Sequence, residues 1–467
     1  MLGKKITDIK NHIKKVYLTY ERPFVVGFSG GKDSTAALQL IWEVIRDIPE
    51  SKRLNNIHVI CTDTLVETPY LKFFLDETLA KIKNAAISEN LPITVHKLTP
   101  LPEKRFWTNL IGKGYPAPSQ MFRWCTERLK IDPVNRFIQE QVSEYNEATI
   151  VLGARKDESA SRQQVLNKKK RDALGLSKHP ILPEVYVFTP IENLTTDEVW
   201  QYLATNNYQC LWGGSNRDLM AIYKNASGGE CPMVIDTSTP SCGNSRFGCW
   251  VCTLVISDTS MENLIDSGED WMIPLLEFRE FLCETQKPDQ KGHFRRLKRR
   301  SGKVYLIRDK SRYSHGPYKF EWRKEFLRRL LKIQKKIQAD KPEILFSAIS
   351  MEELELIRQT WRNEEHDWED SVPAIYKEMT GDDYPFKDDD CVSFTSEDKK
   401  LLYKLCENKM HASLIAKLID LERNLQGMTR RAGIMNKIDK IFSEDWRTEE
   451  ELNNEINQAK QVSENDY

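Results

Sequence analysis

The chain has no long apolar run and no net charge, since its 69 Lys and Arg residues balance 69 Asp and Glu residues. No segment approaches the roughly 18 to 20 consecutive apolar residues that a membrane-spanning helix needs. Residues 1–20 follow an amphipathic helical pattern with lysines and lack the continuous apolar centre of a signal peptide. We therefore expect a cytoplasmic protein. Internal repeats and long low-complexity segments are also absent, and 467 residues suffice for two or three domains.

Cysteine is infrequent, and its distribution argues against a disulfide framework. In a reducing compartment, ten cysteines in a chain of this length do not form one. Six are scattered, at Cys61, Cys125, Cys210, Cys283, Cys391 and Cys406. The other four lie within 22 residues, at Cys231, Cys242, Cys249 and Cys252. This uneven placement points to one cysteine-rich site.

The most informative motif is Ser-Gly-Gly-Lys-Asp-Ser at residues 29–34, directly after an apolar run at 23–28. A strand that leads through glycines into a helix directs backbone N–H groups at a phosphate, and the helix dipole favours the anion. Gly30 and Gly31 permit the tight turn, because neither has a Cβ. Ser29 and Ser34 add hydroxyl groups, and Lys32 adds positive charge. The motif predicts a site for a nucleotide triphosphate.

The spacing of this motif differs from a Walker A loop, which has four residues between its first glycine and Gly-Lys-Ser/Thr. The structural alternative is an ordinary glycine turn that opens a helix. The acid within the motif is also open to two interpretations. Asp33 can help to hold Mg²⁺ on the phosphates, or it is simply an acid in the first turn of the helix.

Strand and helix patterns alternate over the first half of the chain, which predicts a doubly wound parallel sheet with its ligand at the carboxyl ends of the strands. The predicted strands are Phe24–Phe28, Ile57–Cys61, Ile93–Leu98, Thr149–Leu152 and Tyr186–Phe188. The predicted helices include Ser34–Arg46, Tyr70–Asn84, Cys125–Val142 and one capped by Thr195 or Thr196. Residues 206–229 are rich in Asn, Gly and Ser and are expected to be a loop. We divide the chain into a nucleotide domain (1–225), a cysteine-rich and basic region (226–345) and a helical, charged C-terminal region (346–467).

The cysteine-rich segment has the ligands of a metal site. A C-x2-C pair, Cys249 and Cys252, can place two thiolates on one metal or cluster, and Cys231 and Cys242 can complete four-fold coordination. Spacing alone leaves iron–sulfur and zinc as equal alternatives. Four unrelated buried thiols are the structural alternative. Trp250, between the paired cysteines, is expected to shield the site from solvent.

Charge is unevenly distributed in the second half. From His293 to Lys336 there are 17 Lys or Arg residues against three acids, and from Asn363 to Asp390 there are 11 acids against two lysines. The basic run at Arg295, Arg296, Lys298, Arg299, Arg300 and Lys303 favours a polyanion such as DNA. The acidic segment is a candidate docking site, a self-shielding segment or a solvated loop.

Several motifs together resemble a known family. Residues 29–34 are similar to the PP-loop of ATP pyrophosphatases, which cut ATP between its α and β phosphates. Residues 153–162, with Arg155 and Arg162, resemble the GxRxxES-x-R element of sulfate-assimilation reductases. Asp63 to Thr68 resembles their adenosine-side segment, although Leu65 replaces a glycine. The Glu-Cys-Gly-Leu-His segment of those reductases is absent, so reduction of an activated sulfate is not expected.

Residues 20–340, with the long glycine- and cysteine-rich segment, resemble the DndC family, the ATP-dependent sulfurtransferase subunits of bacterial DNA phosphorothioation. The resemblance implies an adenine nucleotide alpha hydrolase-like fold with an inserted cysteine-rich iron–sulfur unit. It also implies ATP, Mg²⁺ and a [4Fe-4S] cluster on Cys231, Cys242, Cys249 and Cys252. The implied partners are DNA, a cysteine desulfurase as sulfur donor, and the companion Dnd subunits DndD and DndE.

The implied reaction replaces a non-bridging oxygen of a DNA phosphate by sulfur after adenylation of that phosphate. Lys32, Asp33, Arg155 and Arg162 are then the expected catalytic residues, and Asp63 an ATP contact. Cys125, flanked by Arg123 and Arg128, is either a sulfur-carrying thiol or a buried structural cysteine. A tRNA base thiolase of the PP-loop class and a non-enzymatic zinc and nucleic-acid-binding module are the alternatives.

Overall fold

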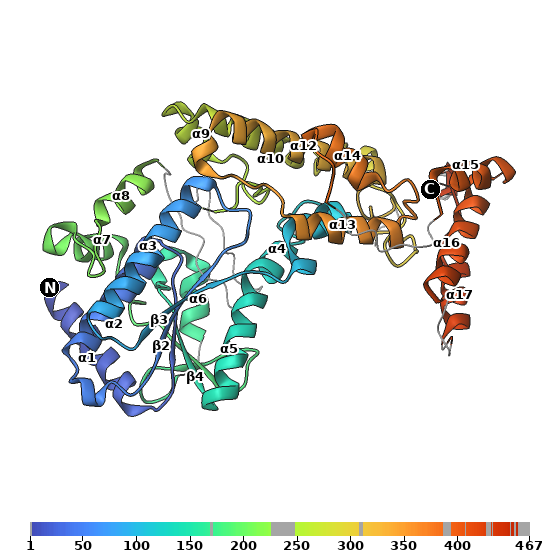
Figure 1. The fold of residues 1–467 in the computed structure, drawn as a ribbon. Helices are drawn as coiled ribbons and strands as arrows, with labels where there is room; N and C mark the ends of the chain where they lie inside the picture. Colours follow the sequence, from blue (N-terminus) through green and yellow to red (C-terminus); the bar gives the residue numbers. More distant parts are fainter. Residues whose placement is uncertain are drawn as a thin grey trace, which may run out of the picture. The chain divides into compact units, whose positions relative to one another are not determined.

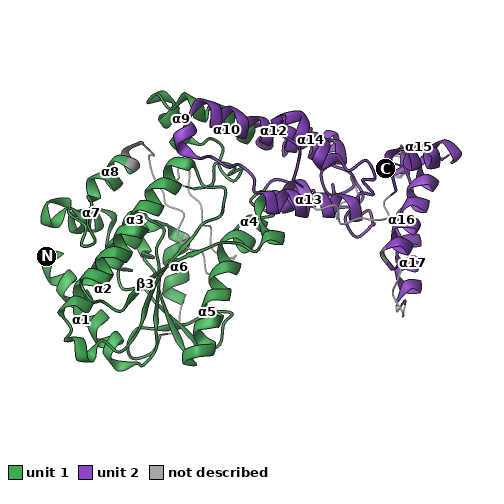
Figure 2. Ribbon diagram, viewed as in Figure 1, with its two compact units in different colours: residues 1–106, 118–279 green, residues 107–117, 280–467 purple. Residues whose placement is uncertain are grey.

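A computed structural model of the chain (Figure 1) describes residues 2–168, 171–225, 248–307, 312–385, 394–406, 408–425, 431, 433–448, 450–452 and 454–455. The chain divides into two compact units, which Figure 2 colours separately. Unit 1 comprises residues 1–106 and 118–279, and unit 2 comprises residues 107–117 and 280–467. No helix in the described ranges is long and apolar enough to cross a membrane.

Unit 1 is built on a six-stranded sheet of order β3-β2-β1-β4-β6-β5. All its pairs are parallel except β5 with β6. The strands are β1 (Phe24–Gly27), β2 (Ile57–Thr62), β3 (Ile93–Leu98), β4 (Ala148–Val151), β5 (Ser177–Lys178) and β6 (Val185–Phe188). The predicted parallel α/β fold and its five predicted strands are confirmed, with ends shifted by one residue. The edge strand β5 was not predicted, because two residues carry no periodic pattern.

Helices cover both faces of this sheet. The helices of unit 1 are α1 (Leu2–Thr19), α2 (Lys32–Asp47), α3 (Pro69–Ser88), α4 (Trp124–Thr126), α5 (Asp132–Tyr145), α6 (Ala160–Lys168), α7 (Thr196–Ala204), α8 (Asn216–Asn225) and α9 (Thr259–Asp266). Side chains alternate across strand β1, so Phe24 and Val26 join the core under α1, α2 and α3, whereas Val25 joins the core under α5. Both faces are therefore apolar, as a sheet between two helical layers requires.

Two short elements depart from the sequence-based prediction. The predicted helix 125–142 is interrupted by a π-helical turn, η4 (Glu127–Ile131), between α4 and α5. Residues 206–215 form the expected loop, with Asn206, Asn207 and Gly213 at positive φ. The same prediction was wrong for residues 216–225, which form α8. This helix was missed because polar residues dominate it, although buried Leu219 and half-buried Tyr223 face the core.

Short helical turns connect the larger elements of unit 1. The 3-10 turns are η1 (Glu50–Lys52), η2 (Pro102–Lys104), η5 (Lys156–Glu158), η6 (Thr205–Tyr208) and η7 (Asp270–Met272). The expected cap before α7 is confirmed, because the Thr195 hydroxyl accepts a hydrogen bond from the Glu198 amide and Glu198 bonds back to the Thr195 amide. The helix α10 (Ile273–Glu284) contains the boundary between the units.

Unit 2 is helical, as predicted for the C-terminal region. Its elements are the π-helical turn η3 (Thr108–Gly112), α11 (Lys291–Phe294), α12 (Phe320–Asp340), η8 (Pro342–Ile344), α13 (Met351–Glu364), α14 (Ser371–Thr380), α15 (Ser396–Leu405), α16 (Lys409–Leu425) and α17 (Ile434–Phe442). Its core includes the side chain of Arg323, fully buried, which donates to the carbonyls of Ile111 and Gly112. Trp361 also donates to the Ile111 carbonyl, so buried donors satisfy the π-helical turn. The three functional regions suggested by the sequence stay a prediction.

Candidate nucleotide and cysteine site

The glycine motif lies where it was expected, between the carboxyl end of β1 and the start of α2. Gly31 is the residue before the helix, and the Ser34 hydroxyl donates to its carbonyl over 3.0 Å. The Ser34 oxygen also accepts from the Ser29 amide at 3.3 Å. Ser29 and Ser34 hydroxyls lie 3.2 Å apart. The two serines therefore fold the motif onto the first turn of α2.

Glycine is required at two positions of this site. Gly30 has φ of +75°, and a Cβ there would lie 2.3 Å from a methyl group of Leu75 on α3. Gly153, directly after β4, is packed against the motif itself. A Cβ on Gly153 would lie 2.7 Å from the carbonyl carbon and oxygen of Asp33. This close packing brings the segment after β4 onto the first turn of α2.

The close packing places Arg155 beside Asp33. Arg155 is 1% exposed and Asp33 is 3% exposed. The guanidinium makes a two-pronged contact with the carboxylate, from Nε to Oδ1 and from Nη2 to Oδ2. Its Nη1 donates to the Thr196 hydroxyl at 3.2 Å and approaches the Leu194 carbonyl and Asp157 at 3.4 Å. Arg155 is thus engaged with groups of the protein, and its predicted contact with a phosphate stays a prediction.

Arg162 is also near the motif but bonds differently. Its Nε lies 3.2 Å from Glu158 Oε2, one turn earlier along the chain. Glu158 Oε1 in turn accepts a hydrogen bond from the Arg155 amide at 2.6 Å. Burial raises the pKa of Glu158, and Arg162 opposes this effect. Arg162 therefore neutralises a carboxylate that supports the backbone of Arg155.

Lys32 faces an aromatic residue that the sequence did not point to. The Lys32 amide donates to the Tyr223 hydroxyl at 3.2 Å. The Lys32 ammonium lies 5.0 Å from the centre of the Tyr223 ring and 3.2 Å from Asp33 Oδ2. The amide of Lys32 is a first-turn N–H of α2, the kind of donor that binds phosphate. The Tyr223 hydroxyl therefore accepts a hydrogen bond from an amide that was predicted to bind phosphate.

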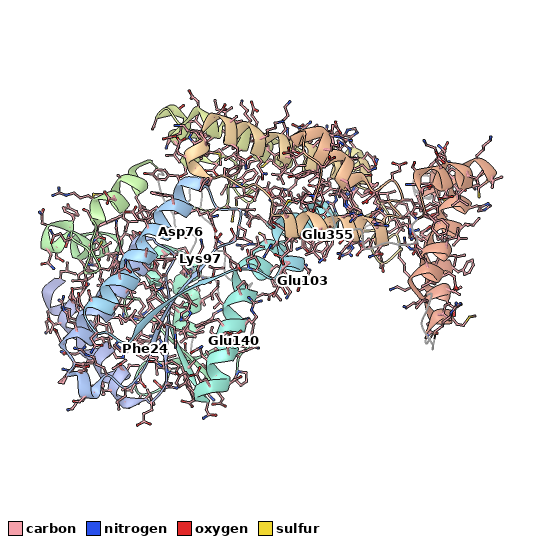
Figure 3. The ribbon with its side chains drawn as sticks, in the orientation of Figure 1. Phe24, Asp76, Lys97, Glu103, Glu140 and Glu355 are labelled. Atoms are coloured by element: carbon pink, nitrogen blue, oxygen red, sulfur yellow. The ribbon has the colours of Figure 1, made fainter. Side chains whose placement is uncertain are left out.

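Asp63, predicted to contact the nucleotide, follows β2 and is 6% exposed. Its Oδ1 accepts from the Leu65 amide at 2.8 Å, and its Oδ2 lies 3.0 Å from the Lys97 ammonium. Lys97 also binds Asp76 on α3, at 2.6 Å (Figure 3). The hydrogen bond from the Leu65 amide to Asp63 supports the turn after β2, where Leu65 has φ of +64°. The related reductase segment has a glycine at this position, and glycine adopts a positive φ readily.

The paired cysteines are attached to the segment after β2. The Trp250 amide donates to the Val66 carbonyl at 3.0 Å, and the Thr68 amide donates to the Gly248 carbonyl at 3.2 Å. Glu67 and Cys249 are the antiparallel partners between these bonds. The sulfur of Cys249 lies 3.3 Å from the Thr64 hydroxyl. Since β2 neighbours β1 in the parallel sheet, Cys249 lies at the same sheet edge as the glycine motif.

The described half of the cysteine site fits a shared metal or cluster. The Cys252 amide donates to the Cys249 carbonyl at 3.0 Å, which makes a tight turn, and the charge of Cys252 adds to the factors that raise the pKa of Cys249. Burial and the charge of Glu67 raise the pKa of Cys249, while Lys130 opposes them. A bound metal ion would supply the positive charge that a buried thiolate needs. Trp250 is 2% exposed, as expected for a side chain that shields the site.

The other half of the predicted metal site lies outside the description. Cys231 and Cys242 belong to residues that the structure does not describe. Within the described residues, no group of three or more His, Cys, Asp or Glu side chains could hold a metal ion. The predicted ligand set therefore stays a prediction. Cys125, on α4, is half-buried, and its role also stays a prediction.

One residue that supports the cysteine turn was missed. Arg279, on α10, is fully buried and donates to the carbonyl of Cys252 at 2.9 Å and of Ile256 at 3.2 Å, with a further bond to Val255. The sequence gives only a weak signal for this role, since Arg279 lies among apolar residues of 273–282 that also include Glu277 and Glu280. Once buried, its guanidinium must find acceptors. It fixes the backbone immediately after the C-x2-C pair.

The basic run in unit 2 is only partly available to a polyanion. Arg296, Lys298 and Arg300 bind Glu365, Glu444 and Glu364 at 2.9, 2.8 and 2.5 Å, respectively. Glu364 and Glu365 begin the acidic segment, so this part of it shields basic residues of its own chain. Intramolecular carboxylates thus pair with three residues of the run, and the prediction that the run tracks phosphates stays a prediction.

The sheet and motif define a class: a parallel α/β fold with a glycine-rich turn between its first strand and the following helix, where such folds commonly bind phosphate. Residues 23–254, just under half of the chain, match the family model of the phosphoadenosine phosphosulfate reductase domain. This part of the chain is therefore similar to the phosphoadenosine phosphosulfate reductase domain. An uncharacterized protein of Methanocaldococcus jannaschii is 28% identical over 191 residues, 41% of this chain. The match spans only 33% of that relative's length.

Solved structures give weaker likenesses. Phosphoadenylyl-sulfate reductase from Candida auris has 12% identity and a TM-score of 0.27, over 46% of this chain and 84% of that one. The U34-tRNA thiolase NcsA from Methanococcus maripaludis, with its [4Fe-4S] cluster, has 15% identity and a TM-score of 0.29, over 60% and 80%. FMN adenylyltransferase from Candida glabrata has 15% identity and a TM-score of 0.26, over 45% and 58%. Scores this low support no conclusion about this chain.

Proposed function

We propose that the chain is an ATP-dependent sulfurtransferase of the DndC kind, which replaces a non-bridging oxygen of a DNA phosphate by sulfur. One observation carries the proposal. The backbone pairing of residues 66–68 with 248–250 attaches Cys249 to the sheet edge that also holds the glycine motif. A nucleotide-activating loop and a cysteine pair at one edge suit a reaction in which activation precedes sulfur transfer.

The chemistry requires two displacements at phosphorus. An oxygen of the DNA phosphate attacks the α-phosphorus of ATP, the bond to the bridging oxygen breaks, and pyrophosphate leaves. Sulfide-level sulfur then attacks the activated DNA phosphorus, and AMP leaves with the former DNA oxygen, so no net oxidation occurs. A poor leaving group is thereby converted into a good one.

The residues of the chain have separate roles in this scheme. The first-turn amides of α2 and the Lys32 ammonium stabilise the negative charge that develops on pyrophosphate. Asp33, held in place by Arg155, is the expected Mg²⁺ ligand, with Mg²⁺ neutralising the phosphates when bound. Arg155 then acts as a positioning residue for the motif. Arg162 and Asp63 are the remaining expected contacts of the nucleotide.

The cysteine site serves the second displacement in this proposal. Cys249 and Cys252, with Cys231 and Cys242, would hold a [4Fe-4S] cluster, which supplies a soft site for sulfur or a structural anchor beside it. Trp250 excludes water from the paired cysteines. Arg279 fixes the backbone that carries Cys252, so the position of the pair relative to the glycine motif is maintained.

The test uses the full chain purified without oxygen and measures two products, pyrophosphate and phosphorothioate DNA. The protein is incubated with duplex DNA, ATP, Mg²⁺ and sulfide. Released pyrophosphate is quantified, and digested DNA is searched by mass spectrometry for phosphorothioate dinucleotides. Lys32→Ala should lower both products by on the order of 100-fold, because a preorganised charge at the leaving group is lost. Lys83→Ala, an exposed lysine on α3, is the matched control and should retain both.

Cys249→Ser separates the two displacements. It should abolish phosphorothioate formation, whereas pyrophosphate release depends on the glycine motif and should persist. Thiolated nucleosides in tRNA, without phosphorothioate in DNA, would identify a tRNA thiolase instead. A colourless protein with one zinc ion per chain and no product would identify a binding module.

A further inference from the structure

The basic run in unit 2 has two sides with different surroundings. Arg295 has an extended backbone, so its side chain and that of Arg296 point to opposite sides. Arg296, Lys298 and Arg300 carry the acidic partners described above. Arg295 and Arg299 instead bind the returning arm of the chain, residues 314–316. Arg295 donates to the His315 and Gly316 carbonyls at 2.7 Å, and Arg299 to the Ser314 hydroxyl at 2.6 Å.

The returning arm brings further basic residues to this second side. Arg295 and Tyr318 are antiparallel partners, as are Leu306 and Tyr313. The Arg296 amide donates to the Pro317 carbonyl at 3.0 Å. This pairing places His315 against α11, where its Nε2 would lie 3.6 Å from a Cβ built on Gly292. Lys291, at the start of α11, is thereby brought to the same side.

The basic residues on this second side interact electrostatically with one another and are not paired with carboxylates of the described residues. Burial lowers the pKa of Lys291, and Arg295 and Arg312 lower it further. Burial followed by the charges of Arg295, Lys291 and Arg312 lowers the pKa of His315 to about 4, with Lys319 adding to the effect. Within the described ranges, none of these basic residues has an ion pair with a carboxylate. Unit 2 thus gathers several positive charges around His315, and these charges help to keep its imidazole neutral.

Four members of this group are half-buried (Lys291, Arg295, His315 and Lys319), and the other two are more accessible. Arg299 and Arg312 are exposed. Tyr305, 47% exposed, lies beneath the Arg299 guanidinium at 5.5 Å from its ring centre. By contrast, Tyr318 is fully buried and bonds to Thr285, so it serves packing. A group of exposed guanidinium and ammonium groups, preorganised by backbone bonds and without internal counter-charge, is suited to successive phosphates of a nucleic-acid backbone.

We propose that this basic face binds the phosphodiester backbone of duplex DNA. The basic face consists of Lys291, Arg295, Arg299, Arg312, His315 and Lys319. The choice of duplex DNA over RNA rests on the proposed function. The neighbouring Arg296, Lys298 and Arg300 are structural and contribute nothing to binding. The face contacts phosphates, so it supplies affinity and orientation without sequence preference.

The test compares Arg299→Gln/Arg312→Gln with a control that removes equal charge from exposed residues of α12, Lys332→Gln/Lys336→Gln. Binding of the full chain to a fluorescent 30-base-pair duplex is measured by anisotropy over a range of salt concentrations. Loss of two phosphate contacts should reduce the slope of log K against log [salt] by roughly 1.8, and affinity at 0.1 M salt by roughly 10- to 100-fold. The control should bind like the wild type, and Arg300→Gln, which breaks an internal ion pair, should also retain the wild-type slope.

An unchanged slope in Arg299→Gln/Arg312→Gln would overturn the proposal, as would equal loss in the control or binding of RNA but not of duplex DNA. Phosphorothioate formation by the wild type is assayed separately. Loss of DNA affinity in the variant with no phosphorothioate from the wild type supports the basic face and contradicts the proposed function. If the wild type forms phosphorothioate and the variant binds DNA as tightly as the wild type, the proposed function is supported and the basic face is contradicted.

Discussion

Single side chains determine how the glycine motif receives a phosphate. The motif's amides point out of the first turn of α2, but the Lys32 amide already donates to the Tyr223 hydroxyl. Arg155 and Asp33 satisfy each other in a buried pair next to it. Removing one partner of such a pair leaves an uncompensated charge, typically at a cost of about 3–5 kcal/mol. The pair therefore fixes the position of the turn, whereas the Tyr223 contact must break before a phosphate oxygen can take its place.

Tyr223→Phe should therefore bind ATP more tightly than the wild type. The variant removes the hydroxyl that competes for the Lys32 amide but leaves the ring beneath the ammonium. A net hydrogen bond is worth about 0.5–1.5 kcal/mol, which corresponds to roughly a two- to twelvefold lower Kd. Calorimetric titration with a non-hydrolysable ATP analogue measures it, with exposed Tyr70→Phe as the control. An equal or higher Kd in Tyr223→Phe would show that the hydroxyl does not compete with the phosphate.

At the scale of elements, the parallel sheet could be predicted because apolar runs of four to six residues alternate with amphipathic helices. The glycine motif could be placed for the same reason, since a strand and a helix flank it. Contacts between distant segments could not be predicted. Arg155 was expected to face phosphate, and nothing in local spacing indicates that Gly153 packs on Asp33 and turns the guanidinium toward it.

The segments after residue 205 illustrate a different limit. Tyr223 was hidden in a stretch read as a loop, because the Asn- and Gly-rich residues before α8 dominate its composition. The basic run was predicted to form one surface, but Arg296, Lys298 and Arg300 pair with carboxylates, whereas Arg295 and Arg299 bond to residues 314–316. Local composition correctly predicted a positively charged run. Which of its residues remain available to a polyanion depends on tertiary partners such as Glu365, which local composition does not reveal.

The strands β2 and β3 carry a buried histidine pair that makes stability depend on pH. His58 Nδ1 lies 2.9 Å from the Thr94 hydroxyl and 3.1 Å from His96 Nε2, and Phe137 packs on both rings. Burial, and then the neighbouring His96, lower the pKa of His58 to about 4. Burial also lowers the pKa of His96. The folded state therefore holds this pair neutral.

We expect acid to destabilise unit 1 through this pair. Between the ordinary histidine pKa of about 6.5 and the lowered value, the unfolded chain binds a proton that the folded chain does not. Stability is thus complete above pH 6.5 and falls as the pH drops toward 4, by at most about 1.4 kcal/mol per pH unit for His58. Urea unfolding at pH 7.5 and 5.0 measures the difference in the free energy of unfolding. His58→Gln should reduce that difference, and exposed His293→Gln should leave it unchanged; equal differences in all three proteins would contradict the expectation.

At the scale of the whole molecule, zero net charge conceals strong local imbalance. The acidic segment beginning at Glu364 neutralises one side of the basic run. Burial alone would raise the pKa of Glu365, but Arg323 and Arg296 outweigh it and hold the pKa at about 2. This carboxylate therefore stays ionised at physiological pH and can pair with Arg296 and Arg323 throughout that range. The residues of the basic face have no carboxylate partner among the described residues, so their charge is the part that we propose a partner uses.

A second property at the scale of the whole molecule is the pairing of two segments that lie far apart in the sequence; we call this pairing the closure. The hydrogen bonds between 66–68 and 248–250 join segments about 180 residues apart, and few other backbone bonds hold the second segment to the sheet. Metal binding by ligands on such a segment contributes directly to its folding. If the cysteines hold a metal as we propose, removing it should release this closure while the β1–β2 pairing, formed by buried strands, remains intact.

Hydrogen exchange followed by mass spectrometry tests this expectation on the holoprotein and on protein depleted of metal by a chelator under reducing conditions. Peptides that contain the Thr68 and Trp250 amides should exchange at least tenfold faster after depletion, because their acceptors are lost when the segments separate. Peptides from β1 and β2 should not change. Cys252→Ser should reproduce the depleted pattern without a chelator, whereas Cys210→Ser, a cysteine outside the site, should not. If depletion leaves residues 66–68 and 248–250 as protected as before, the metal is not what holds the cysteine pair at the sheet edge. If β1 and β2 lose protection as well, the metal supports the whole of unit 1 and not this closure alone.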